Sequence, residues 1–99
     1  MAHCPPALLK DLAPLFADLR RWPGLVERSR GVFYARGQPL LHFHLTRAGS
    51  RRADVRGRDG WTSLDLPTPI TAASRRALQR LVEARYRERE PARRSAARR

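Results

Sequence analysis

The stretch Pro39-Leu-Leu-His-Phe-His-Leu45 decides how this chain of 99 residues folds, because its apolar and polar residues alternate. Successive side chains of a β-strand point to opposite faces, so the apolar residues at positions 41, 43 and 45 share one face. His42 and His44 share the other face. The pattern predicts a strand with one side on a hydrophobic core and two histidines on the side that meets solvent or a partner.

Similar alternating runs continue on both sides of this stretch. Between Leu25 and Leu66 they are short and are separated by turns that contain glycine, which is typical of an antiparallel meander. We expect strands near residues 25–29, 31–36, 40–47, 51–56 and 61–66.

Helical patterns flank the meander. Apolar residues recur at helical spacing from about Pro6 to Trp22, and Pro14 predicts a kink or a restart there. A second helix is expected after Thr71, a residue suited to cap its first turn. Two amphipathic helices and one amphipathic sheet pack most simply as two layers. We therefore predict an α+β two-layer sandwich, in which a four- to five-stranded antiparallel meander carries an N-terminal and a C-terminal helix on one face.

Residues 1–90 are expected to form a single domain, and residues 91–99 a disordered tail, because the tail has no large apolar side chain to bury in a core. The tail contains arginines that predict nonspecific contacts with nucleic-acid phosphates, namely Arg93, Arg94, Arg98 and Arg99. The whole chain carries a formal net charge of +12. Such a charge favours a nucleic acid or another polyanion as a partner, although the arginine bias of a GC-rich genome would produce it as well.

The composition also predicts where the protein works. The single cysteine, Cys4, has no partner for an internal disulfide, which fits a reducing compartment. The chain starts without the pattern of a signal peptide, and no apolar run approaches the roughly 20 residues that cross a bilayer. We expect a cytoplasmic bacterial protein without a membrane partner.

The turn lengths predict which side chains meet on the polar face of the sheet. An odd turn at residues 48–50 and a four-residue turn at residues 57–60 set the register of the last three strands. The expected pairs are His44 with Asp54, His42 with Arg56, Arg56 with Trp61, Asp54 with Ser63, and Arg52 with Asp65. The glycine turn at position 37 leaves open whether Tyr34 or Phe33 joins them. The predicted binding face comprises His42, His44, Arg52, Asp54, Arg56, Trp61 and Ser63.

This set of side chains invites two catalytic hypotheses. A hydrolytic triad of His44, Asp54 and Ser63 is rejected, because the register puts the carboxylate in the middle, where a triad needs the histidine. A metal site of His42, His44 and Asp54 has no evident fourth ligand, and Arg52 and Arg56 flank it. A surface hydrogen bond between His44 and Asp54 is favoured instead. We therefore assign no catalytic residue, no metal and no cofactor.

The function predicted first is a non-catalytic binding or interaction module, which would engage a protein partner or a second copy through the polar sheet face. Nucleic-acid binding by the same face is the alternative, because exposed aromatics beside arginines stack single-stranded bases. A metal- or small-molecule-dependent enzyme that uses His42, His44 and Asp54 is the third hypothesis.

Several short motifs follow one another in an order that resembles small bacterial domains of unknown function labelled luciferase-like. They are Trp22-Pro23-Gly24, the turn at Gly37, His42-x-His44 and Ala53-Asp54-Val55, and they cover roughly the middle half of the chain. The position of Trp61 before the last helix departs from that pattern. The resemblance implies no activity, but it implies that the two histidines and Asp54 are features of the family.

Overall fold

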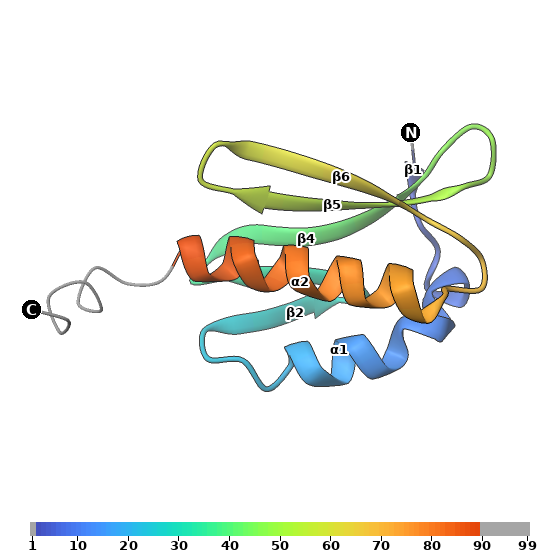
Figure 1. Ribbon diagram of the computed structural model, residues 1–99. Coiled ribbons are helices and arrows are strands. Elements are labelled where there is room, and N and C mark those ends of the chain that lie inside the picture. The colour runs from blue at the N-terminus through green and yellow to red at the C-terminus, as the bar shows by residue number, and fades with distance from the viewer. Residues whose placement is uncertain (1, 90–99) are drawn as a thin grey trace, which may run out of the picture.

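The computed structural model describes residues 2–89 and confirms the antiparallel meander (Figure 1). The strands follow one another in space as they do in sequence, from β2 at one edge to β6 at the other. Their bounds are β2 Leu25–Ser29, β3 Val32–Ala35, β4 Gln38–Leu45, β5 Arg51–Gly57 and β6 Gly60–Leu66. The predicted tail at 91–99, with its four arginines, lies outside the described residues.

The N-terminal helical segment restarts where proline predicted it. A 3₁₀ helix, η1, covers Pro6–Leu12, and the α-helix α1 covers Ala13–Leu19. Pro14 lies in the first turn of α1, where the amide hydrogen that proline lacks has no partner within the helix. The helix ends at Leu19, earlier than the predicted Trp22.

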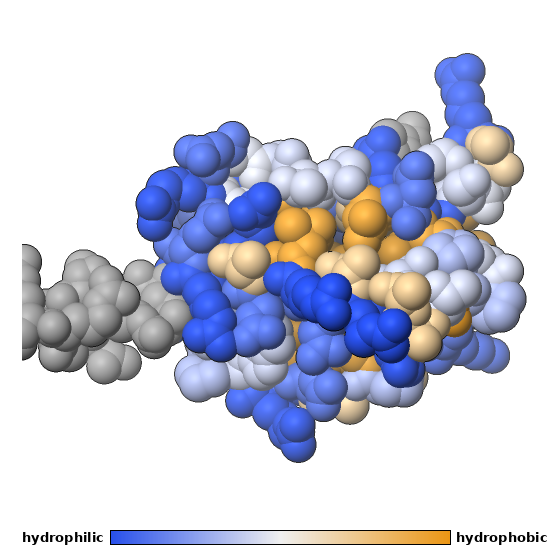
Figure 2. Space-filling model, in the orientation of Figure 1, coloured by the Kyte–Doolittle hydropathy of each residue, from blue (hydrophilic) through white to orange (hydrophobic). Residues whose placement is uncertain are grey.

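The C-terminal helix, α2, covers Ala72–Glu88. Thr71 caps it as predicted, because its hydroxyl oxygen accepts a hydrogen bond from the backbone N–H of Ser74 at 3.0 Å. Both α1 and α2 lie on the same side of the sheet (Figure 1). Seen from that side, hydrophilic residues cover the molecule around apolar patches (Figure 2). None of the helices in residues 2–89 is long and apolar enough to cross a membrane.

The core fills the space between the helices and the sheet. Its side chains come from every helix and from the central strands, and each is almost fully buried: Leu9, Leu12, Phe16, Phe33, Leu41, Phe43, Ala53, Val55, Leu78 and Val82. None of the helices within residues 2–89 lies on the opposite face of the sheet, and we call it the open face. The two-layer α+β sandwich is therefore the observed architecture.

The register between β4 and β5 differs from the prediction by two residues. His42 lies opposite Asp54, and His44 lies opposite Arg52. The turn between the strands has five residues rather than three, because Thr46 closes it. Its backbone N–H donates to the carbonyl of Ser50 at 2.8 Å, and its hydroxyl accepts from the Ser50 N–H at 3.1 Å. Both turn lengths are odd, so every side chain still faces the predicted side.

The pairing of β5 with β6 is as predicted. Arg56 lies opposite Trp61, Asp54 opposite Ser63, and Arg52 opposite Asp65. The turn that joins the strands is two residues shorter at its tip than predicted, because Gly57 and Gly60 pair with each other. Adding one pair at the tip leaves the register unchanged.

A bulge settles the question left open between β3 and β4. The turn at residues 36–37 is even, which alone would send Tyr34 toward the core. The register shifts by one residue beyond Tyr34, so that Phe33 pairs with Leu41 while Tyr34 pairs with Pro39. Between these two pairs β4 has one residue more than β3. This extra residue reverses which face of the sheet each side chain of β3 points to. Phe33 and Ala35 are buried as a result, and Tyr34 lies on the open face.

An additional strand, β1, was not predicted. It covers Ala2–His3 and pairs antiparallel with β4, with His3 opposite His44. β3 is four residues long and β4 is eight, so β3 leaves part of one edge of β4 uncovered. β1 takes that place, and the backbone N–H of Cys4 extends the pairing to the Phe43 carbonyl at 3.1 Å.

A buried ion pair connects η1, β5 and the segment before α2. Arg51 is 1 % exposed and donates two hydrogen bonds to the Asp11 carboxylate, at 2.6 and 2.9 Å. Its guanidinium also donates to the carbonyls of Leu8 and Pro67. Asp11 in turn accepts the backbone N–H of Ile70 at 2.7 Å. The Arg51 hydrogen bond is the main reason that the pKa of Asp11 lies below its usual value.

Candidate functional site

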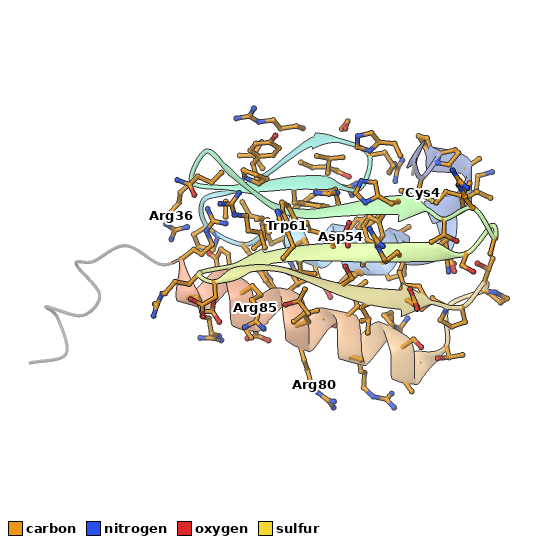
Figure 3. All side chains as sticks on the ribbon, turned by 90° about the horizontal axis from the view of Figure 1, so that it is seen from above. Cys4, Arg36, Asp54, Trp61, Arg80 and Arg85 are labelled. Atoms are coloured by element: carbon orange, nitrogen blue, oxygen red, sulfur yellow. The ribbon has the colours of Figure 1, made fainter. Side chains whose placement is uncertain are left out.

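The open face brings the predicted residues together. β4 carries His42 and His44, while the other members of the set lie on the two strands beside it, β5 and β6. Asp54 and Trp61 are seen over the strands in Figure 3, and Arg80 projects from α2 away from the sheet. The alternation of the strands therefore places all seven predicted residues on one surface.

Asp54 is the centre of this surface. Only 6 % of it is exposed, yet its carboxylate accepts hydrogen bonds from the Ser63 hydroxyl at 2.7 Å and from Arg52 Nε at 3.2 Å. The third partner is His44, whose Nδ1 lies 2.6 Å from Asp54 Oδ2. The predicted contact between His44 and Asp54 is thus confirmed, although it runs diagonally between the strands. The Asp54 carboxylate lies between His44 and Ser63, as predicted, and this order excludes a hydrolytic triad of these three residues.

The ionisation of Asp54 follows from these contacts. Burial alone would raise the pKa of the carboxyl, but the hydrogen bonds from Ser63, His44 and Arg52 outweigh it and hold the pKa below its usual value. The group is therefore charged at neutral pH. The hydrogen bonds from Ser63, His44 and Arg52 stabilise that negative charge within the protein.

All three histidines of the chain gather on the open face. The ring centroids of His42 and His44 lie 4.6 Å apart, and His3 lies 5.7 Å from His44 and 6.4 Å from His42. Nδ1 of His42 is buried and has no hydrogen-bond partner among the described residues. Burial, together with the nearby His44, lowers the pKa of His42 and favours its neutral form.

Two aromatic side chains on the open face have an arginine over them. Trp61 is 43 % exposed, and its ring meets the His42 ring edge-on at 4.5 Å. The guanidinium carbon of Arg56 lies 5.8 Å from the centre of the Trp61 ring. Near the other edge of the sheet, Arg28 lies 4.0 Å above Tyr34. Both geometries are within the range of cation–π attraction.

A groove of about 320 Å³ borders the open face, at the end of the sheet where Arg36 is seen in Figure 3. Its lining includes Arg36, Arg56, Arg58 and Arg89. Burial, together with the nearby positive charge of Arg56, lowers the pKa of Arg89. The one acidic side chain in the described lining is Glu88, which pairs with Arg85 at 2.6 Å.

Three parts of the site escaped prediction. His3 stands in a two-residue strand, which is too short to show alternation. Arg28 was not predicted to contact Tyr34, one of the two aromatic residues left open for this face, and the bulge in β4 places Tyr34 beside it. The arginine groove combines the β3–β4 turn, the β5–β6 hairpin and the end of α2, which are far apart in sequence. The charge of the chain was the one signal that pointed to it.

Comparison of the chain with protein-family models, with curated proteins and with solved structures finds no match. The resemblance to luciferase-like domains therefore stays a prediction.

Proposed function

We propose that the protein is a binding module and that its open face engages a single-stranded nucleic acid. The observation that carries the proposal is the pairing of aromatic rings on the open face with arginines, the exposed Trp61 with Arg56 and the half-buried Tyr34 with Arg28. Stacking on aromatic rings binds bases of any sequence, and the arginines neutralise the phosphates that follow them.

The state of Asp54 favours this ligand over a second copy of the chain. As an exposed acid, Asp54 would repel phosphates, but it is buried and bonded to Ser63, His44 and Arg52. Arg52 is bonded to Asp54 and lies opposite Asp65, the exposed acid of this face, so the positive charges that the open face offers a partner are chiefly those of Arg28 and Arg56. In a symmetric dimer through this face, arginines would face arginines, which costs free energy unless an acid lies between them.

The arginine groove extends the same surface. Arg56 both contacts Trp61 and lines the groove, so a strand whose base stacks on Trp61 has its next phosphates beside Arg36, Arg58 and Arg89. A continuous track of aromatics and cations is what a flexible single strand requires. A rigid duplex would reach the arginines but not the rings.

The test is fluorescence anisotropy with a labelled single-stranded oligonucleotide and its duplex at about 50 and 200 mM salt. Trp61→Ala is expected to weaken single-strand binding roughly 5- to 150-fold, since each stacked base contributes about 1–3 kcal/mol. Arg56→Gln is expected to weaken it as well. Arg80→Gln is the matched control, because it removes the same charge from the outer side of α2 (Figure 3) and is expected to have little effect.

Three results would count against the proposal. One is the absence of binding. Another is an equal loss in Arg56→Gln and Arg80→Gln, which would mean that net charge alone attracts the strand. The third is binding that disappears when the tail arginines 93, 94, 98 and 99 are replaced by glutamine in the full chain. A concentration-dependent dimer that Trp61→Ala dissociates would favour a protein interface on the open face instead.

A further inference from the structure

We propose that His3, His42 and His44 form a binding site for a divalent transition-metal ion such as Zn²⁺, with Asp54 as the residue that positions His44. The inference is independent of nucleic-acid binding. Imidazole nitrogen is a preferred ligand of zinc, copper and nickel, whereas magnesium and calcium prefer oxygen.

The rings of the three histidines converge on one place. The chain has three histidines, and two distant segments bring them to one place, because β1 pairs with β4. Zinc–nitrogen bonds of about 2.0–2.1 Å place imidazole rings around one ion with centroids roughly 5 Å apart. The observed separations of 4.6, 5.7 and 6.4 Å bracket that value. His3 is the most distant of the three and is exposed, so its side chain is free to approach.

The ring nitrogens of two of the proposed ligands lie close together. One nitrogen each of His42 and His44 lies within 4.8 Å of the other and of a carboxylate oxygen of Asp54, the residue that positions His44. His42 also has a buried Nδ1 for which no described residue is a hydrogen-bond partner. An imidazole that makes few bonds within the protein loses little when it binds a metal.

Asp54 holds the His44 ring in an orientation that suits a metal ligand. His44 uses Nδ1 in its contact with Asp54 Oδ2 at 2.6 Å, which leaves Nε2 of the same ring for a metal. A carboxylate that holds the far nitrogen of a ligating histidine fixes the orientation of the ring and makes the ligand more basic. Ser63 and Arg52 hold the carboxylate in turn.

The objections to a metal at this place were the two flanking arginines, Arg52 and Arg56, and the lack of an evident fourth ligand. The Arg52 guanidinium is bonded to Asp54 Oδ1 at 3.2 Å, so the charges of this pair largely cancel at short range. His3 supplies a third nitrogen ligand, so Asp54 is not needed as a ligand. Three nitrogen ligands leave a fourth coordination position on the ion, which a water molecule or an anion can occupy.

The site is tested by isothermal titration calorimetry of the full chain with zinc chloride. We expect saturable binding of one ion per chain. Replacement of a residue beside a metal ligand weakens binding about 10- to 100-fold, so His3→Ala, His42→Ala and His44→Ala should each cost at least that much. Asp54→Asn should fall within that range, while Asp65→Asn, on the same face, and Cys4→Ala should bind as the wild type does.

Circular dichroism establishes that each variant is folded, and His3→Ala tests the site even if the variants within the sheet unfold, because His3 is exposed at the N-terminal end. Cobalt provides a second measurement, since nitrogen ligation changes its visible absorption. The absence of saturable zinc binding overturns the proposal. So does unchanged binding in any of the three histidine variants.

Discussion

Replacing Asp11 with asparagine should lower the free energy of unfolding by about 3–5 kcal/mol, the largest loss expected from any single substitution considered for this chain. The reason is that Arg51 would keep its charge while 1 % exposed, would lose the opposite charge, and would find an amide NH2 in place of one of the two oxygens that accept its hydrogen bonds at 2.6 and 2.9 Å. The substitution also weakens the link from η1 to Ile70. Urea denaturation followed by circular dichroism measures the loss.

Asp18→Asn is the matched control, because it removes the same charge from the neighbouring helix. Asp18 pairs with Arg21 at 3.2 Å, but their side chains are 47 % and 80 % exposed. Such pairs contribute about 0–1 kcal/mol, so a small change is expected. Equal losses in the two variants would contradict a structural role for the buried pair.

The same pair predicts a dependence on pH. The pKa of Asp11 is lower in the folded protein than its unfolded value of about 3.9, chiefly through the Arg51 hydrogen bond. Its contribution to stability is therefore complete above the unfolded pKa and is lost as the pH falls through the folded pKa. Below about pH 4 the wild type should lose stability faster than Asp11→Asn. Parallel curves would show that Asp11 is not involved.

Asp54→Asn should lower the free energy of unfolding by about 2–3 kcal/mol, since hydrogen bonds to a charged group contribute about 1.5–3 kcal/mol. Asparagine has one acceptor oxygen in place of two, so it does not satisfy Ser63, His44 and Arg52 together. Urea denaturation gives the value. The ring of His44 should also become more mobile, which side-chain NMR relaxation detects.

Asp65→Asn is the control for this second substitution. Asp65 lies on the same face opposite Arg52, but it is exposed, so a change within about 0.5 kcal/mol is expected. If Asp54→Asn were as mild as this control, Asp54 would not be the centre of the polar network.

Much of the fold was predictable because alternation fixes the face of each strand. The run from Pro39 to Leu45 identified the buried and the open side of β4, and the turn at Gly57 gave the register of β5 with β6. The turn that Thr46 closes, between β4 and β5, is longer than predicted. Its number of residues is odd, as predicted, so the side chains of both strands face the predicted sides. The layers followed from the amphipathic helices. Such features depend on local sequence alone.

The candidate site was less predictable, because its decisive parts depend on contacts between distant segments. The bulge that places Tyr34 on the open face arises where β3 pairs with β4, and the local sequence did not predict it. His3 joins the other histidines only because β3 is shorter than β4. The burial of Asp54 was not visible either, since an acid in an alternating strand normally faces water. Burial and pairing of charges therefore required the structure.

Binding of single-stranded nucleic acid to the open face is tested by mapping the surface that an oligonucleotide contacts, with ¹⁵N NMR spectra of the full chain. Binding to the open face predicts that the amide signals of His42, His44 and Arg56 shift, together with the indole N–H of Trp61. The amides around Arg80 on α2 should stay in place. Shifts confined to α2 or to residues 91–99 would contradict the proposed function.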